Sequence, residues 1–481
     1  MPTLESLIET LQSWHLDFVQ FAGGFVGGPE NVLVLLFAFA KIGLVLAHVL
    51  GFIPLIVYGE RRIIGLVQDR PGPNRVGPFG LLQGIVDGVK LLLKEDFIPA
   101  HADRTLYLIA PGLVLVPAFL AMCIIPFGPV IDGEALLALY TMLGLESLYT
   151  PSSTLPLAIT NPNIGILYVF AMTSVAVYGI TLAGWSSENK WSLLGGIRAS
   201  AQMISYEISM SLSIIGVLLI VGSLNLYDIV GSQESIWHWN VFAQPVGFLL
   251  FLTAIFAETN RLPFDLAEGE SELTGGFHTE YSSMKFALFF MAEYANMITA
   301  SAICVTLFLG GYHLIPAEFV EGIIAWVLNF ISSSEAGIPI LPGTAALLAS
   351  ALAPLGIAIK IGALLVLFIM TRAIWPRMRY DQVMNLGWKL MLVAGLLNLL
   401  ITAITVGVLA GIGARRAPSP ADVGASIDAA IQNGKIVLFF ITGGLLLLVD
   451  RWYARRRRRK LAAAYPYFGR SIGKTAGAAS P

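Results

Sequence analysis

Residues 241–310 read VFAQPVGFLLFLTAIFAETNRLPFDLAEGESELTGGFHTEYSSMKFALFFMAEYANMITASAICVTLFLG. Two apolar runs in this stretch, 241–257 and 286–310, flank a loop, Glu258–Glu280, that holds six carboxylates and a single arginine, Arg261. Each run is close to the roughly 20 residues that cross a bilayer as a helix. The stretch therefore predicts two membrane-spanning helices joined by an acidic loop, and we expect the function to lie at that loop.

The composition of the whole chain extends this pattern. Its 481 residues are 56% hydrophobic and only 12% charged, and the mean hydropathy is +0.76. These values are typical of an all-α polytopic membrane protein. Apolar runs predict nine spans, at 31–57, 105–126, 163–184, 203–222, 241–257, 286–310, 346–370, 390–411 and 434–450. A further apolar segment, Glu318–Phe330, is shorter than a crossing and is expected to lie laterally or at the membrane interface.

The basic residues predict the orientation of the spans. Most of the 29 Lys and Arg residues fall in alternate connections and in the tail after Asp450. Basic residues close to span ends stay on the cytoplasmic side, so we expect an external N-terminus and a cytoplasmic C-terminus. No Lys or Arg precedes Lys41, and the charged start of a secretory signal is therefore missing. The first residues are expected to remain on the mature chain.

No motif for a metal or a redox cofactor is present in the sequence. Cys123 and Cys304 stand far apart in separate predicted spans, and the six histidines form no ligand pair at helical spacing. The chain also has no Gly-rich phosphate loop and no dinucleotide fingerprint. We therefore expect no metal, flavin, iron–sulfur cluster or nucleic acid to bind this chain.

The connection between the first two spans predicts an amphipathic helix over Phe79–Glu95. Its apolar and polar positions both step by four, three and four, as one helix requires. They are Leu82, Val86, Val89 and Leu93 on one side, and Gln83, Asp87, Lys90 and Lys94 on the other. The helix could lie on the membrane surface. Its polar stripe mixes both signs of charge, however, which favours a protein partner or a buried polar cavity.

Several long motifs resemble one family in order and in register: the quinone-site membrane subunit of respiratory complex I, which is called the H or the 1 subunit. They are ERRIIGLVQDRPGPNRVGPFGLLQ with DGVKLLLKE, SYEISMSL, ETNRLPFDLAEGESEL with GFHTEY, FFMAEYANM, and RAIWPRMRYDQVMNLGWK. The resemblance covers about Glu60–Leu400. The chain departs from the family in its first thirty residues, at Gly84 where proline is usual, in a longer external segment over Ile131–Asn161, and beyond about Ala410.

The resemblance implies a division of the chain into five parts. A core of eight transmembrane helices occupies 31–411 after an external segment, 1–30. An external linker, 412–433, then leads to an added ninth helix, 434–450, and a basic cytoplasmic tail, 451–481. The tail contains RRRRRK at 455–460, which could bind anionic lipid headgroups or dock to an acidic partner subunit.

The function implied by the resemblance is part of a proton-pumping NADH:quinone oxidoreductase. The chain would hold the quinone, its substrate, but no redox centre. Quinone-binding positions implied by the family are Gln68, Arg70, Arg75, Phe264 and Asp265. The implied proton pathway comprises Glu207, Glu258, Glu268, Glu270, Glu272 and Glu293. Lys41 and Lys360 lie inside predicted spans and are candidates for snorkelling anchors or counter-ions of buried carboxylates.

Glu293 is the most informative of these acids. It lies eight residues into the sixth predicted span, where an ionised carboxylate costs about 2.5 to 3.5 kcal/mol on insertion scales. A solvated loop or simple ion pairing could explain the other loop acids. That explanation is hard to sustain for Glu207 and Glu293, because both lie in apolar surroundings.

The expected partners are the other subunits of complex I, membrane lipid and quinone. They include iron–sulfur subunits of a peripheral arm and antiporter-like membrane subunits, and the expected location is a bacterial plasma membrane. Two alternatives remain open. One is the equivalent subunit of a related membrane complex with another electron donor, and the other is a stand-alone ion transporter. The sequence leaves open whether the quinone is ubiquinone or menaquinone, and whether the glutamates carry protons or only transmit charge.

Overall fold

The structure, a computed structural model, describes residues 29–131, 133–142, 154–265, 275–313, 344–416 and 422–464, with isolated positions at 322 and 324. Its regular elements in these ranges are helices, and the one extended pairing is an isolated bridge between Ile131 and Leu155. The expected external segment 1–30, the lateral segment Glu318–Phe330 and the end of the basic tail lie almost wholly outside the described residues. The described chain confirms a helical fold.

Seven helices in the described ranges are long and apolar enough to cross a membrane, which confirms a polytopic membrane protein. They are α2 (Pro29–Val67), α4 (Arg104–Met122), α6 (Gly165–Ser186), α7 (Lys190–Val221), α11 (Ser283–Phe308), α13 (Thr344–Ile374) and the continuous stretch made by α14 (Tyr380–Asn385), a π-helical turn (Leu386–Met391) and α15 (Leu392–Arg416). Seven of the nine expected spans correspond to these helices.

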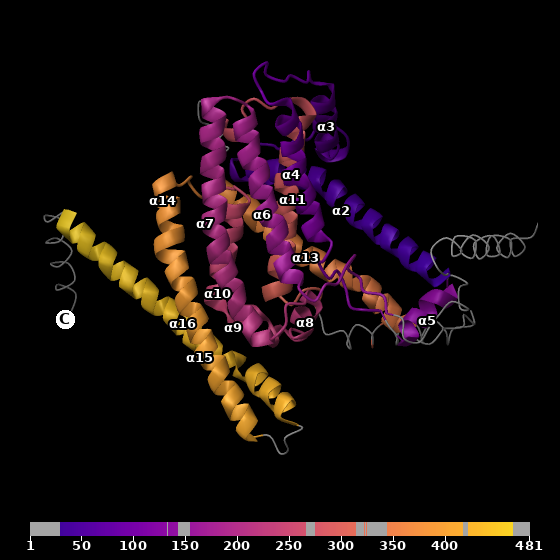
Figure 1. Ribbon diagram of the computed structural model, residues 1–481, viewed down its shortest axis with the longest axis vertical. Coiled ribbons are helices and arrows are strands. Elements are labelled where there is room, and N and C mark those ends of the chain that lie inside the picture. The colour runs from indigo at the N-terminus through magenta and orange to yellow at the C-terminus, as the bar shows by residue number, and fades with distance from the viewer. Residues whose placement is uncertain are drawn as a thin grey trace, which may run out of the picture.

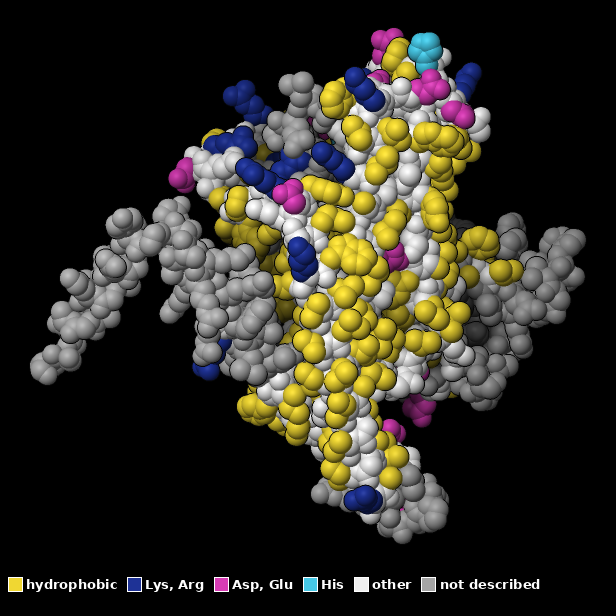
Figure 2. Space-filling view, turned by 60° about the vertical axis from the view of Figure 1, so that its left-hand side comes forward, with side chains coloured by type: hydrophobic (Ala, Val, Ile, Leu, Met, Phe, Trp, Pro, Cys, Tyr) yellow, Lys and Arg dark blue, Asp and Glu magenta, His cyan; other side chains and the backbone are white. Residues whose placement is uncertain are grey.

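The helices form an upright bundle with two inclined flanks. In Figure 1, α4, α6, α7 and α11 stand side by side, while α2 and α13 slant away on one side and α15 crosses α16 on the other. The largest buried apolar cluster draws its residues from α2, α4, α6, α7, α10, α11 and α13. Figure 2 shows apolar side chains covering the middle of the molecule and basic side chains gathered towards its upper end. This distribution fits a molecule whose middle lies in hydrocarbon.

The fifth expected span corresponds to a shorter helix, α10 (Pro245–Glu258), which follows the single turn α9 (Asn240–Ala243). Its 14 residues extend for about 21 Å at 1.5 Å per residue, less than the roughly 30 Å of bilayer hydrocarbon. The residues after it are buried, with Asn260 5% exposed and Phe264 3% exposed. Irregular backbone is tolerated at membrane depth where protein surrounds it. Helix α10 therefore ends inside the bundle.

The ninth expected span lies within a longer helix, α16 (Val423–Ala464), which has 42 residues. It packs against α15, α9 and α10. Its Lys435 side chain is 2% exposed. The Lys435 ammonium donates hydrogen bonds to the carbonyl oxygens of Ser232, at 3.2 Å, and His238, at 3.0 Å. These carbonyls follow α8 (Leu226–Gly231) and end the 3₁₀ turn η3 (Ile236–His238). A buried cation thus joins the added helix to the core.

A helix, α3 (Gln83–Leu93), lies inside the range predicted for the amphipathic helix, after the turn η1 (Pro78–Gly80). Its Asp87 carboxylate accepts hydrogen bonds from Arg61, at 2.5 Å, and from Gln83, at 2.9 Å. On the other stripe, Leu93 is 83% exposed. The polar stripe therefore contacts α2, while the surface that the apolar stripe covers stays a prediction.

We expect Lys435→Met to loosen α16 from the core. Methionine keeps the length and apolar stem but removes the ammonium, so two buried carbonyls lose a charged donor, and a hydrogen bond to a charged group contributes about 1.5 to 3 kcal/mol. The thermal denaturation midpoint of the protein solubilised in mild detergent should fall. Ile436→Met, at the exposed neighbouring position, is the matched control and should leave the midpoint unchanged. Equal midpoints for the two variants would show that Lys435 does not hold the helix.

Candidate functional site

Four charged side chains from distant parts of the chain meet inside the bundle. Arg261, in the loop after α10, donates from Nη1 to Glu60 of α2 at 2.9 Å and pairs through Nε with Glu293 of α11. Arg372 of α13 also pairs with Glu60. The Tyr294 hydroxyl donates to the second oxygen of Glu60 at 2.6 Å, and the Arg261 guanidinium lies 4.5 Å from the centre of the Tyr294 ring. We call Glu60, Arg261, Glu293 and Arg372 the buried charge cluster.

Burial makes this pairing strong. The side chains of Arg261 and Glu60 are 7% and 5% exposed, and that of Glu293 is 13% exposed. Two carboxylates and two guanidinium groups balance in formal charge, which is what a buried ionic group needs in order to be tolerated. A guanidinium group stays protonated in proteins, and the paired carboxylates of Glu293 and Glu60 stabilise its charge. Arg261 therefore stays charged.

A side-chain amide on α7 contacts the loop that carries Arg261 at three points. The Gln202 side-chain nitrogen donates to the Ala257 carbonyl at 2.8 Å, the Phe264 carbonyl at 3.0 Å and the Asn260 side-chain oxygen at 3.2 Å. Asn260 has a positive φ of 49°, so the backbone leaves the helical conformation there. The Phe264 ring packs on the Tyr206 ring, with 5.4 Å between their centres. The turn thereby directs Arg261 at Glu60 and Glu293.

A small polar cavity borders the buried charge cluster. Its volume is about 30 Å³. Its lining includes Arg261, Glu293 and Arg372 of the cluster, together with Asn260, Asp265, His278 and Phe290. The Arg261 Nη2 atom is buried and has no hydrogen-bond partner among the described residues. Burial lowers the pKa of His278 to about 4, so the imidazole is neutral at pH 7. The cavity therefore presents a fixed positive donor beside acidic groups.

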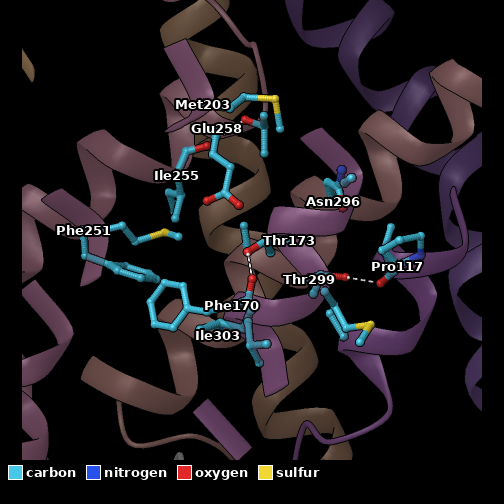
Figure 3. A pocket seen from close by; sticks show the side chains of 18 of the residues that line it. Pro117, Phe170, Thr173, Met203, Phe251, Ile255, Glu258, Asn296, Thr299 and Ile303 are labelled. Carbon is cyan, nitrogen blue, oxygen red and sulfur yellow. Dashed lines mark hydrogen bonds between the residues drawn. The ribbon is translucent and has the colours of Figure 1, made fainter. Parts of the chain in front are cut away.

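A second cavity lies between α4, α6, α7, α10 and α11, with Glu258 and Thr259 in its lining. Its volume is about 40 Å³. Figure 3 shows the carboxyl group of Glu258, the last residue of α10, directed into it, with Asn296 and Thr173 across the space. Close by, the Ser174 hydroxyl of α6 donates to the Glu207 carboxylate of α7. Glu207 is also near enough to Glu258 for their charges to interact.

The structure separates the expected quinone-binding residues into two groups. Phe264 and Asp265 lie beside the buried charge cluster, where Phe264 is 3% exposed and Asp265 lines the polar cavity. Gln68, Arg70 and Arg75 follow the end of α2 and are exposed. The Arg70 Nε atom donates to the Gln68 side-chain oxygen at 2.8 Å. Whether a quinone contacts either group stays a prediction.

The structure describes three of the six residues expected to form the proton pathway. Glu207, Glu258 and Glu293 lie in the bundle as given above, whereas Glu268, Glu270 and Glu272 lie outside the described residues. Sequence reasoning missed Glu60 and Arg372, because both are placed in connections between predicted spans. The observation that could have found them is the charge balance, since Arg261 alone cannot neutralise the acids around it.

The two lysines inside spans contact backbone oxygens. Lys41 donates to the carbonyls of Pro156, at 3.3 Å, and Ala158, at 2.9 Å. Lys360 donates to the carbonyls of Leu309, Gly311 and His313, between 2.6 and 3.0 Å. No described carboxylate lies within salt-bridge distance of either lysine. A counter-ion role toward a carboxylate stays a prediction.

Metal ligands are not grouped in the part of the chain that the structure describes. No cluster of three or more His, Cys, Asp or Glu side chains there could hold an ion. Instead, carboxyl groups lie near a permanently charged guanidinium and near cavities that are large enough for a few water molecules.

Comparisons with known proteins agree on one family. A model of the family described as NADH dehydrogenase matches residues 40–403. The H 2 subunit of the NADH-quinone oxidoreductase of Koribacter versatilis is 43% identical over 379 residues, which cover 78% of this chain and 98% of that protein. The H 2 subunit of Geobacter sulfurreducens is 44% identical over 363 residues, or 76% of this chain and 94% of that protein. The H subunit of Leptospira biflexa is 45% identical over 348 residues, or 72% and 88%. The matched region ends within α15, so α16 lies beyond it.

We expect Arg261→Met to destabilise the protein by roughly 3 to 5 kcal/mol, because it leaves buried carboxylates without a partner. The amount of tagged chain in the membrane and its thermal denaturation midpoint should both fall. Combining Arg261→Met with Glu293→Gln removes one uncompensated charge and should restore part of the loss, as a coupled pair requires. Arg104→Met, at an exposed arginine, controls for the loss of a guanidinium. If Arg261→Met denatures at the same temperature as Arg104→Met, the cluster does not stabilise the bundle.

Proposed function

The chain belongs to the NADH dehydrogenase family and is a subunit of an NADH-quinone oxidoreductase, and from this membership we propose that it forms the quinone-binding tunnel of the enzyme and links quinone reduction to proton translocation through buried glutamates. One observation carries the proposal. The buried charge cluster pairs Glu60 and Glu293 with arginine, while Glu258 and Glu207, whose charges interact with each other, have no basic partner among the described residues.

The quinone end of the proposed path lies at the polar cavity. A quinone needs an apolar passage for its tail and a few polar groups for its headgroup. Phe264 and Asp265 would line the passage beside Arg261, and Gln68, Arg70 and Arg75 would lie near its mouth. The polar side chains around Arg261 and the exposed apolar stripe of α3 support this arrangement.

The coupling step follows from the charge balance of quinone reduction. A quinone takes up two electrons and two protons to give the quinol, and negative charge develops on its oxygens before the protons arrive. Negative charge on a quinone oxygen near the polar cavity competes with the Glu293 carboxylate for the Arg261 guanidinium. Both attractions to the guanidinium act over a short distance in a poorly screened interior. A weakened ion pair favours protonation of Glu293. The change in protonation of Glu293 would then alter the protonation of Glu258 and Glu207.

The acidic loop would supply the remaining carboxylates of the path. Glu268, Glu270 and Glu272 follow Asp265, which lines the polar cavity, by three, five and seven residues in the sequence. We propose that they exchange protons with Glu293 or alter its charge when the quinone is reduced. Electrons would reach the quinone from iron–sulfur subunits of a peripheral arm, as the family resemblance implies.

We further propose nine spans in a bacterial plasma membrane, with an external N-terminus and a cytoplasmic C-terminus. The short helix α10 would cross together with its flanking segments, and α16 would return the chain to the cytoplasm. Antiporter-like membrane subunits would receive the charge signal from the glutamates. The basic residues gathered at one end of the molecule support this orientation.

Glu293→Gln is expected to lower inhibitor-sensitive NADH:quinone reduction and NADH-driven proton pumping by about a hundredfold or more, in the range seen when a positioned acid or base is lost. The measurement uses inverted membrane vesicles and a pH-sensitive dye. Glu258→Gln should have the same effect, and it disturbs no ion pair among the described residues, so it separates proton transfer from assembly.

Glu188→Gln, at an exposed glutamate between α6 and α7, is the matched control and should pump normally. Normal rates of both reactions in fully assembled Glu293→Gln and Glu258→Gln enzymes would refute the glutamate pathway.

A further inference from the structure

Helix α3 connects two helices that carry acids of the buried charge cluster. It packs against both α2 and α11, near the upper end of the bundle in Figure 1. The contact with α2 is close, because a Cβ atom at Gly84 would lie only 2.8 Å from the Pro54 carbonyl oxygen. The Arg61 guanidinium of α2 also pairs with the Asp87 carboxylate of α3. The first half of α3 is therefore attached to α2.

The end of α3 is held by hydroxyl groups at the start of α11. The Ser282 hydroxyl donates to the Glu95 carbonyl at 3.3 Å and accepts from the Phe97 amide at 3.1 Å. The Ser283 hydroxyl donates to the Leu91 carbonyl at 3.0 Å. Leu91 lies in the last turn of α3, where carbonyls have no partner within the helix. The two serines thus supply partners to the end of α3 and join it to α11.

An ion pair strengthens this junction. The Lys285 ammonium donates to the Asp96 carboxylate at 2.7 Å and lies 5.3 Å from the centre of the Tyr107 ring. The Lys285 side chain is 10% exposed, whereas that of Asp96 is 54% exposed. Removing Asp96 would leave a largely buried ammonium without an acidic partner among the described residues, which is unfavourable. We call the four side chains that hold the end of α3 the α3 clasp: Asp96, Ser282, Ser283 and Lys285.

The clasp determines where the apolar stripe of α3 lies. Val89 and Leu93 of that stripe are exposed, although apolar side chains near a membrane favour contact with hydrocarbon. In the proposed function, the hydrocarbon is the tail of a quinone that passes beside α3. Because α3 is attached to α2 at one end and to α11 at the other, a change at the clasp moves the stripe relative to that passage.

We propose that the α3 clasp positions the apolar stripe of α3 beside the quinone passage, and that the Lys285–Asp96 pair thereby sets how readily a quinone with a long apolar tail enters. The inference rests on the proposed function, because it assigns positioning residues to the same passage. Neither residue of the pair would touch the quinone headgroup or take up a transferred proton. Loss of the pair should therefore affect entry of the tail and leave the chemistry unaltered.

The test compares two substrates of the assembled enzyme: a quinone with a long apolar tail and a tail-less analogue. Asp96→Asn and Lys285→Met should each raise the KM of the long-tailed quinone about fivefold, the upper end of what one partly exposed ion pair supports. The KM of the tail-less analogue and both kcat values should stay unchanged. The reversed pair, Asp96→Lys with Lys285→Asp, keeps the combined length of the two side chains and should bring the KM back near that of the unaltered enzyme.

Glu95→Gln and Lys94→Met are the matched controls. Both side chains are exposed and border Asp96 in the sequence, and neither forms an ion pair in the ranges that the structure describes. Each control should keep the KM of the unaltered enzyme. An unchanged KM for the long-tailed quinone in assembled Asp96→Asn enzyme would overturn the inference, and so would an equal rise for the tail-less analogue.

Val89→Asn separates the inference from the proposed function. It places an amide on the stripe itself, so it should raise the KM of the long-tailed quinone whether or not the clasp is intact. If Val89→Asn raises this KM and Asp96→Asn does not, the inference fails while the proposed passage stands. If neither variant changes it, the passage beside α3 fails as well.

Discussion

The pairing of Arg261 with two carboxylates is the constraint on which the rest of the structure depends. A guanidinium group keeps its charge in any protein environment, so Arg261 can be buried only where acids surround it. Glu60 and Glu293 provide them from α2 and α11, and Arg372 of α13 balances the second negative charge. Three helices must therefore converge on one loop. The packing of the bundle and the electrostatics of the site are consequences of the same contact.

The shape of α10 follows from that constraint. A helix long enough to cross the membrane would carry Arg261 past the acids, whereas a helix that ends at Glu258 allows the chain to turn toward them. Pro263 contributes to the break, because proline disfavours helical conformation in the residue before it. The buried carbonyls of the turn then need partners, and the Gln202 side-chain nitrogen donates to those of Ala257 and Phe264 as well as to the Asn260 side chain. Irregular backbone at membrane depth is tolerated here because α7 satisfies it.

Hydropathy predicted the long spans and the exceptional position of Glu293, since a carboxyl group within an apolar run is visible in the sequence itself. It could not predict the partners of that carboxyl group. The first predicted span ends at residue 57, three residues before Glu60, while α2 continues without a break to Val67. Arg261 and Arg372 reach Glu60 across 201 and 312 residues of sequence. Contacts over such separations leave no local pattern.

The buried bases differ in the groups that they contact, and in the proposed path this difference would distinguish two kinds of acid. Lys360 and Lys435 donate to carbonyls at the ends of helices, where the helix dipole is negative, and Lys41 also donates to carbonyls. The arginines pair with carboxylates. Among the described residues, Glu207 and Glu258 are therefore left without a fixed cation. An acid held by a guanidinium transmits a change of charge, whereas an acid beside hydroxyls and a cavity for water can change its proton. In the path that we propose, charge displacement at Glu293 would lead to proton exchange at Glu258.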